Sequence, residues 1–429
     1  MFGNPPRINL PANPDMACRS LPLYRNGKPD LCRNRRTNDI AALQNRARRL
    51  WSMRKAPARY GAALPWRKGR RGVKRSGRAA SRLDSLQILR FFAALLVVIG
   101  HTQHALLERL GAAAGRYAFV PLDWGLGVDV FFVISGFVMY YLMHDRFAQA
   151  GATATFLRRR VVRVVPMYWL FTTLVLAVGL ATGAVDLPWT NILFSYLFLP
   201  GPVCGEYCFP VFTLGWTINY EMLFYALFAI ALGFPRRIGV AVVVGLIAGL
   251  IVMGQAVPVS WSMLHFWGYP IIGEFLFGIG LAAGFLRGWR VSRGAGWALV
   301  AAGLVLATVS YQLDLYDHIW RLWTGGIPAA LILGGAVFGL EPRGAHGRWL
   351  AVLVVGGDAS YALYLSHPVT IRVADAVAGK IGLFGHAPWA FWSGTVVAAV
   401  IGSFVVHHAI EKPLLARFYR RPNLGAGIP

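Results

Sequence analysis

The feature that most constrains the fold is an apolar run of about 20 residues that recurs along the chain, since this is the length an α-helix needs to cross a bilayer. The first run extends from Leu83 to Leu107 and reads LDSLQILRFFAALLVVIGHTQHALL. Hydrophobic residues make up 56% of the chain, and the mean hydropathy is +0.50. These properties predict an all-α, polytopic membrane bundle rather than a soluble domain with a large core.

The excess of positive charge lies at the N-terminus. The net charge is +25, and residues 1–82 contain 21 Lys and Arg against three acids, Asp15, Asp30 and Asp39. This segment has no run long enough for a signal peptide or a transmembrane helix. We expect a largely disordered arm that its cations hold on the cytoplasmic side. It lacks a recognisable nucleic-acid-binding fold, so we expect no nucleic-acid partner. Met53 offers an alternative start of translation.

The apolar runs predict ten spans between a basic arm (1–82) and a short cytoplasmic tail (415–429), with the membrane domain at 83–414. We place them at about 85–107, 124–143, 164–184, 213–233, 237–254, 268–286, 295–312, 325–340, 349–370 and 388–410. A shorter apolar piece, 191–199, ends in Pro-Gly-Pro and predicts an interfacial or re-entrant segment.

The distribution of Lys and Arg supports this number of spans. Those in the connections that ten spans put inside the cell are Arg158, Arg159, Arg160, Arg163, Arg236, Arg237, Arg287, Arg290, Arg293, Arg343, Arg348, Lys412, Arg417, Arg420 and Arg421. The outer connections hold fewer, namely Arg109, Arg116, Arg321, Arg372 and Lys380. The positive-inside rule therefore supports ten spans with both termini in the cytoplasm. We expect the protein in a bacterial cytoplasmic membrane.

Ionisable side chains occur within the predicted spans, where they are costly. Arg90 and His101 share the first span, 11 residues and thus about 16 Å apart along a helix axis. Depth along each span places one ionisable group from each of five spans in the outer half of the membrane: His101, Asp129, Glu221, Glu274 and His367. Separate, locally satisfied polar residues are one interpretation. A functional cavity is the one we favour for the group as a whole.

A second cluster of charges precedes the span at 164–184. Arg158, Arg159, Arg160 and Arg163 lie within six residues, and Arg159 and Arg163 are spaced to share one helical face. Topology alone explains some of these arginines. A tight guanidinium cluster also suits the phosphates of a nucleotide-containing donor.

Other potential ligands give weaker patterns. His101 and His104 are three residues apart without a third ligand nearby, so we expect no metal site. Cys204 and Cys208 lie on the predicted outer side, where a local disulfide is a hypothesis.

Seven segments, taken in order, resemble the acyltransferase 3 family of integral-membrane acyltransferases. They are LDSLQILRFFAALLVVIGHTQH, GVDVFFVISGFVMYY, FLRRRVVRVVPMYW, LGWTINYEMLFY, GEFLFGIGLA, DASYALYLSHPV and IEKPL, and they cover about Leu83 to Leu414. The resemblance implies ten spans, a cytoplasmic acyl-CoA donor and an acceptor hydroxyl, usually on a sugar, at the outer face.

The resemblance also assigns residues. It matches Arg90, His101 and Asp129 to key positions of the family, which we expect to be catalytic, and it also matches Arg159, Arg160 and Arg163. Together with the adjacent Arg158, these three arginines form the expected donor site. Glu221 matches a further acidic catalytic position, although Asn219-Tyr220-Glu221 departs from the commoner Ser-Val-Glu run. The positions expected to contact substrate are Trp216, Glu274, Tyr361, Tyr364 and His367.

The expected reaction is acyl transfer, most readily of an acetyl group, from acyl-CoA to a hydroxyl of a sugar, polysaccharide or lipid-linked glycan. His101 would act as general base or carry the acyl group transiently, and Asp129 would orient its ring. A secondary transporter also carries buried charges at mid-depth. A non-catalytic partner of a polysaccharide export machine is the other alternative, and it would tolerate the loss of His101.

Overall fold

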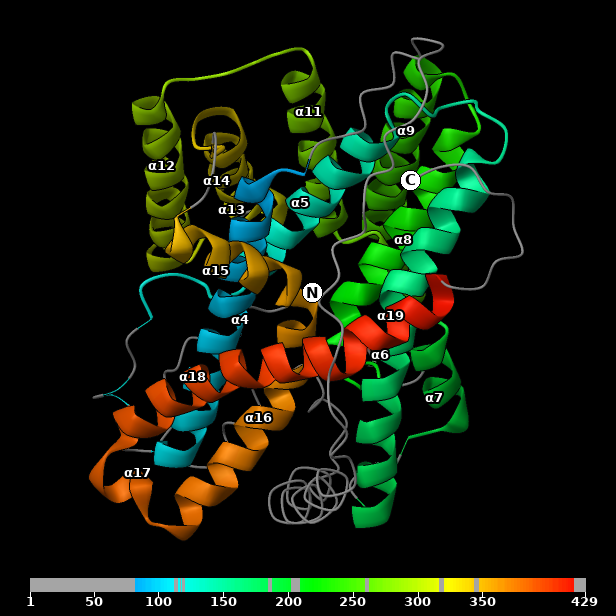
Figure 1. Cartoon of the computed structure of the whole chain (residues 1–429). Coiled ribbons are helices and arrows are strands. Elements are labelled where there is room, and N and C mark those ends of the chain that lie inside the picture. The colour runs from blue at the N-terminus through cyan, green and yellow to red at the C-terminus, as the bar shows by residue number, and fades with distance from the viewer. Residues whose placement is uncertain are drawn as a thin grey trace, which may run out of the picture.

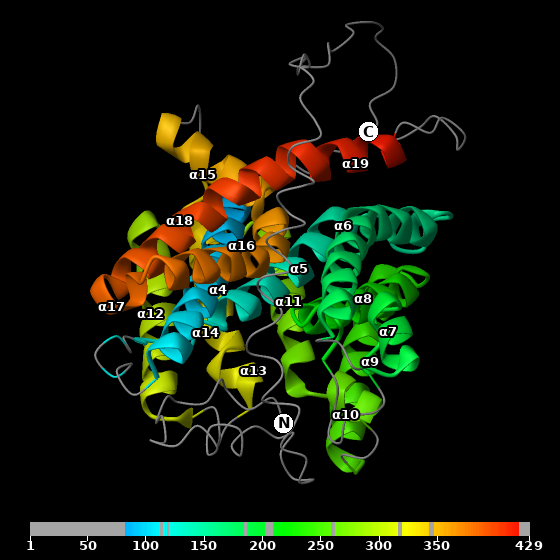
Figure 2. The same cartoon turned by 90° about the horizontal axis from the view of Figure 1, so that it is seen from below.

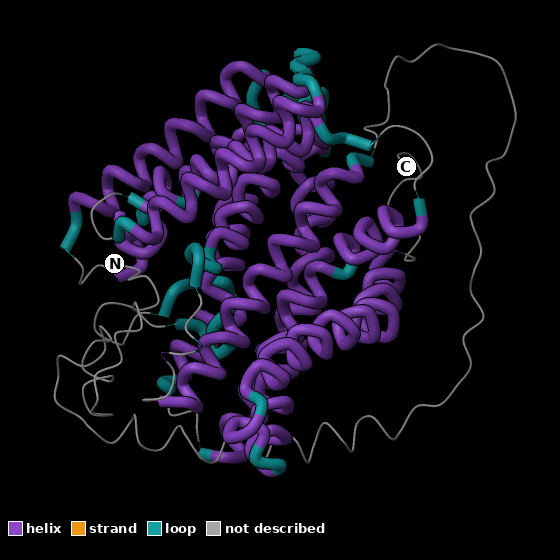
Figure 3. The backbone as a smooth tube through the Cα atoms, turned by 90° about the vertical axis from the view of Figure 1, so that its left-hand side faces the viewer, coloured by secondary structure: helices purple, strands orange, loops and turns teal. Residues whose placement is uncertain are grey.

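The computed structural model describes residues 82–111, 115, 117, 120–183, 187–201, 209–258, 262–315, 320–342 and 347–419. Within these ranges the chain is helical and contains no strand (Figures 1 and 3). The prediction of an all-α membrane bundle is therefore confirmed. The Cys204–Cys208 hypothesis and nearly all of the basic arm lie outside the described residues.

The described helices follow one another as α4 (Asp84–Leu110), α5 (Leu126–Met143), α6 (Ala152–Thr182), α7 (Trp189–Tyr196), α8 (Gly215–Leu232), α9 (Arg236–Ala256), α10 (Ser262–Trp267), η3 (Pro270–Gly273), α11 (Glu274–Leu286), α12 (Arg293–Gln312), α13 (Arg321–Thr324), α14 (Gly326–Gly339), α15 (Arg348–Asp358), α16 (Ser360–Lys380), α17 (Leu383–His386), α18 (Pro388–Val406), η5 (His407–Glu411) and α19 (Lys412–Tyr419).

Nine helical segments of the described chain are long and apolar enough to span a membrane, and a bent pair makes ten. That pair is α15 and α16, which meet at Ala359 with a bend of 72°. The expected span at 349–370 thus corresponds to two helices with a bend between them, which count as one span only when taken together. The apolar run continues through Gly356 and Gly357, but the chain changes direction after Asp358.

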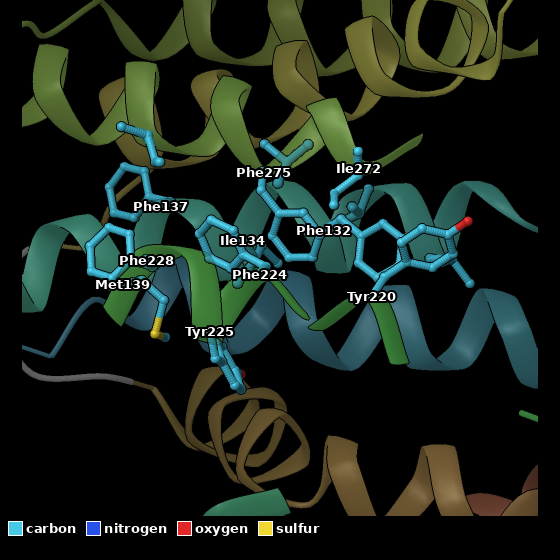
Figure 4. Packing of buried hydrophobic residues seen from close by; sticks show 14 of the residues in the cluster. Phe132, Ile134, Phe137, Met139, Tyr220, Phe224, Tyr225, Phe228, Ile272 and Phe275 are labelled. Atoms are coloured by element: carbon cyan, nitrogen blue, oxygen red, sulfur yellow. The ribbon is translucent and has the colours of Figure 1, made fainter. Parts of the chain in front are cut away.

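Helix α5 lies at the centre of the molecule, and 14 of its 18 residues are buried, most of them apolar. Its Phe132 stacks on Phe275 of α11 at 4.8 Å between ring centroids, and Phe224 of α8 stacks on the same ring at 4.2 Å (Figure 4). Helices α5 and α11 approach so closely that a Cβ added at Gly278 would lie 2.0 Å from the carbonyl oxygen of Val133. These contacts fix the positions of α5, α8 and α11 relative to one another, and these helices carry several of the predicted site residues.

Helix α4 packs against α5 on one side and against α15, α16 and α18 on others. Helices α18, η5 and α19 form one long rod that runs from α16 and α17 toward α6 (Figures 1 and 2). The rod thus brings α19, at the C-terminal end of the described chain, into contact with α6. This placement matters for the site, because α6 carries the arginine cluster.

The outer surfaces of several helices are apolar. Val252 on α9 is 67% exposed, Trp297 on α12 is 64% exposed and Ile401 on α18 is 60% exposed. Water would not favour so many exposed apolar side chains, whereas lipid does. The exposed faces therefore fit a bilayer environment.

Candidate active site

A pocket opens among α4, α5, α6, α8 and α16, with an empty volume of about 840 Å³ that includes space open to the outside. Six of the eight apolar residues in its wall come from α5. Its polar lining residues are Arg90, Ser135, Arg160, Arg163, Thr217, Glu221, Tyr225, Ser360, Tyr361 and Tyr364. Sequence-distant helices thus bring many of the predicted site residues to one cavity.

Three arginines face this pocket. Arg90 Nε donates to Ser360 Oγ at 3.3 Å, while the guanidinium groups of Arg160 and Arg163 lie over the rings of Tyr225 and Tyr361 at 5.9 and 5.8 Å. The Nε of Arg160 is buried without a hydrogen-bond partner among the described residues. A buried N–H of this kind is suited to donate a hydrogen bond to an anionic ligand.

Arg158 and Arg159, which the sequence grouped with these arginines, are exposed and do not line the pocket. The pair that shares the pocket face of α6 is Arg160 and Arg163, rather than Arg159 and Arg163. The cluster of arginines was visible in the sequence. Which ones point inward depends on how α6 packs on α8 and α16.

Arg163 has a partner that the sequence analysis did not assign. Its Nη1 donates to Glu411 Oε1 at 2.6 Å, and the other Glu411 oxygen lies 2.6 Å from His407 Nδ1. Glu411 is fully buried and ends η5, a π-helical turn inserted between α18 and α19. Such turns often place functional residues. The IEKPL segment contains Glu411, but only the tertiary structure shows what it contacts.

Glu221 lies on the pocket wall. It accepts a hydrogen bond from Ser135 Oγ at 3.0 Å and another from the hydroxyl of Tyr225. It lines the same cavity as Arg90 and Arg160, so it offsets part of their positive charge. On the same helix, Trp216 packs edge-on against Tyr220 with centroids 6.2 Å apart.

His101 lies on the exposed face of α4 and meets His367 of α16. The atoms His101 Nδ1 and His367 Nε2 are 2.9 Å apart, and the two rings are nearly parallel, with an interplanar angle of 12°. His367 is fully buried, and its Nδ1 lies 3.1 Å from the Leu363 carbonyl oxygen. Two imidazoles separated by 266 residues in sequence thus form one hydrogen-bonded pair.

Tyr364 lies between the arginine pocket and the histidine pair. It lines the pocket, and its ring meets that of His367 edge-on at 6.1 Å between centroids. Its hydroxyl is held by Thr217 Oγ1 at 2.7 Å. His101 is not among the pocket's lining residues, so a molecule in the pocket would reach the histidines along the side of Tyr364.

Asp129 and Glu274 lie away from both the arginine pocket and the histidine pair, in a separate cluster of charges. Asp129 accepts hydrogen bonds from both Nε and Nη2 of Arg321, at 2.9 and 3.0 Å. Arg321 also forms an ion pair with Asp123 at 3.1 Å. A Cβ added at Gly325 would lie 2.8 Å from the Asp129 carboxylate, and one at Gly326 would lie 2.9 Å from Cγ of Glu274. Both acids therefore sit at the junction of α13 and α14.

The five ionisable groups that the sequence assigned to one layer thus separate into three sets. His101 pairs with His367, Glu221 faces the arginine pocket, and Asp129 and Glu274 lie beside α13. Sequence reasoning missed Arg321 as the partner of Asp129, although an arginine next to an apolar run on the predicted outer side was a usable signal.

Comparison with known proteins gives a consistent result. A sequence model described as an acyltransferase domain matches residues 83–408. The chain is 36% identical over 296 residues to the exopolysaccharide production protein ExoZ of Rhizobium meliloti, covering 68% of this chain and 89% of that protein. It is 26% identical to the acyltransferase MdmB of Streptomyces mycarofaciens, covering 79% of this chain and 93% of that protein.

A third relative is nodulation protein 10 of Rhizobium leguminosarum bv. viciae, which is 27% identical over 77% of this chain and 93% of its own length. No solved structure matches the chain. The family match spans the helices that carry the arginine pocket and the histidine pair. The chain therefore belongs to the acyltransferase 3 family and is a multi-pass membrane acyltransferase.

Proposed function

We propose that this protein transfers an acyl group, an acetyl group in the simplest case, from cytoplasmic acyl-CoA to a hydroxyl of an extracytoplasmic sugar, polysaccharide or lipid-linked glycan. The observation that carries the proposal is the arrangement along α4. Arg90 faces the arginine pocket, and His101, about 16 Å further along the helix, pairs with His367. The similarity to an exopolysaccharide production protein supports a glycan acceptor.

In this proposal the arginine pocket is the donor site. Arg90, Arg160 and Arg163 supply three guanidinium groups around one cavity, which suits the phosphates of coenzyme A. The positive-inside rule predicts that this end of α4 faces the cytoplasm of a bacterium and that both chain termini lie on that side. The apolar wall from α5 fits the less polar pantetheine arm, which would extend along Tyr361 and Tyr364 toward His101.

His101 then acts as the general base. Its imidazole takes the proton of the acceptor hydroxyl while the oxygen attacks the thioester carbonyl, and the C–S bond breaks to release coenzyme A as its thiolate, which takes up a proton. In a second route the imidazole itself attacks the thioester, and the acyl-imidazole passes its acyl group to the acceptor. Both routes need an unprotonated ring nitrogen at His101. Histidine provides one because its ordinary pKa lies close to neutral pH.

The test compares the wild type with His101→Ala and His104→Ala at matched levels in the membrane. His104 is the control because it is an exposed histidine one turn further along α4 and is outside the proposed site. Mass spectrometry of surface glycans and glycolipids should show an acyl-sized mass increment in the wild type and in His104→Ala but not in His101→Ala. Identical glycan profiles in all three strains, with acyl-CoA present and the wild type folded, would exclude a sugar acceptor.

A further inference from the structure

We propose that His367 is the positioning residue for His101: it fixes the tautomer of the His101 ring so that Nδ1 carries the proton and Nε2 presents its lone pair. This inference rests on the proposed function and deepens it by naming the reacting nitrogen. It starts from the contact of 2.9 Å between His101 Nδ1 and His367 Nε2.

The tautomer of His367 is set by its own helix. Its Nδ1 lies 3.1 Å from the carbonyl oxygen of Leu363, and a carbonyl oxygen can only accept a hydrogen bond. In a neutral ring, therefore, Nδ1 bears the proton and Nε2 is the acceptor. Pro368 follows directly and has no N–H to donate to the carbonyl of Tyr364, so α16 offers this ring an environment rich in acceptors.

The consequence passes to His101. Since His367 Nε2 accepts, His101 Nδ1 must donate, and the lone pair of His101 is left on Nε2. The nearly parallel rings keep the two nitrogens in line. His367 is fully buried, whereas His101 keeps exposed surface on α4. His101 is therefore the ring that a substrate can reach, and His367 supports it from behind.

This arrangement serves both chemical routes. As general base, His101 Nε2 gains the acceptor proton, and the positive charge that develops is shared through the Nδ1 hydrogen bond with His367. As nucleophile, Nε2 bonds to the acyl carbon, the C–S bond breaks, and the Nδ1 proton moves to His367 Nε2, which leaves a neutral acyl-imidazole. When the acceptor oxygen then takes the acyl group, the C–N bond breaks and that proton returns to His101 Nδ1. The proton of the acceptor hydroxyl neutralises the thiolate formed in the first step.

Asp129, the residue expected to orient His101, is engaged elsewhere. Both of its oxygens receive hydrogen bonds from Arg321. The supporting group at His101 is thus a second imidazole rather than a carboxylate. A neutral partner of this kind places no negative charge beside the base within the membrane, where an unpaired charge is costly.

Three variants of His367 separate positioning from packing. In His367→Gln, a side-chain oxygen can take the place of Nε2 and still accept from His101. His367→Asn places its amide near the former Nδ1, where it can bond Leu363 but is too short to reach His101. His367→Met keeps the volume and removes both contacts. Membranes of each strain are supplied with isotopically labelled acetyl-CoA, and label in their own glycan fraction is measured.

We expect kcat to fall about 100-fold in His367→Asn and His367→Met and less than about tenfold in His367→Gln, with the KM for acetyl-CoA within about twofold of the wild type. Equal losses in the Gln and Asn variants would overturn the inference. So would an effect confined to KM, because a positioning residue acts on the transition state.

A second measurement is independent of activity. Solid-state ¹⁵N NMR of the full-length protein with labelled histidine, assigned by comparison with His101→Asn, reports which nitrogen of His101 carries the proton. We expect the Nδ1–H form in the wild type and its loss in His367→Met. An Nε2–H form in the wild type refutes the inference whatever the reaction is. If the Nδ1–H form is found but the wild type transfers no label, the proposed function fails, and with it the catalytic role of the pair.

Discussion

Replacing Arg160 by glutamine should weaken the binding of coenzyme A without affecting a donor fragment that lacks phosphates. Arg160 is half-buried in the pocket wall, and its Nε has no hydrogen-bond partner among the described residues. Arg159, the preceding residue, is exposed and lies outside the pocket. Two adjacent arginines of equal charge therefore make a matched pair, since only one can touch a molecule in the cavity.

The magnitude follows from the kind of contact that is lost. A hydrogen bond to a charged group contributes about 1.5–3 kcal/mol. At about 1.4 kcal/mol for each factor of ten, this corresponds to a Kd increase of about 10- to 150-fold. Because the pocket is partly open and Arg160 is only half-buried, we expect the lower part of this interval, about 10- to 30-fold.

The assay is equilibrium binding of radiolabelled coenzyme A to the purified protein in detergent, which needs no knowledge of the acceptor. Arg159→Gln should change the Kd by less than about twofold. Pantetheine, which has the thiol arm but no phosphate, should bind Arg160→Gln and the wild type equally. The reasoning is refuted if Arg159→Gln weakens the binding of coenzyme A as much as Arg160→Gln does. It is also refuted if Arg160→Gln raises the Kd for pantetheine by the same factor as the Kd for coenzyme A.

Three further substitutions test the packing around the site. Glu411→Gln removes the carboxylate that Arg163 contacts. Because Arg163 keeps 29% exposure, we expect the free energy of unfolding to fall by about 1–3 kcal/mol, with a lower Tm in detergent. An unchanged Tm would show that the Arg163–Glu411 ion pair does not stabilise the fold. Gly278→Ala should destabilise the protein by about 1–3 kcal/mol, because its Cβ meets backbone at 2.0 Å, whereas Gly280→Ala meets nothing within 4 Å and should unfold at the wild-type temperature. Arg321→Met leaves two buried carboxylates without their cation and should cost about 3–5 kcal/mol, measured by urea or thermal unfolding; full stability would show that the acids are not held by this pair.

The number and position of the spans could be read from the sequence, because the bilayer imposes a local condition on each one. A helix that crosses it must be apolar for about 20 residues, and every such run is visible without knowledge of its neighbours. The exception at 349–370 has the same origin. Hydropathy records an apolar run but not its direction, so the 72° bend between α15 and α16 could not be foreseen.

The candidate site was predictable as a set of residue types but not as a set of contacts. Placing ionisable groups by depth put Glu221 in one layer with His101, whereas Glu221 faces the arginine pocket. The number of residues from a span end gives a height only for a straight helix of known tilt. It gives no rotation about the axis, which is why Arg160 rather than Arg159 turned out to be the pocket neighbour of Arg163.

The sequence by itself determined that this chain is a helical membrane protein, and the order of its motifs indicated the acyltransferase 3 family. Only the tertiary structure decided which of its polar groups meet. The contacts of Arg90 with Ser360, of His101 with His367 and of Arg163 with Glu411 each join residues about 250 or more positions apart. Such pairs depend on how whole helices pack, and packing sums many weak contacts that no local pattern of residues encodes.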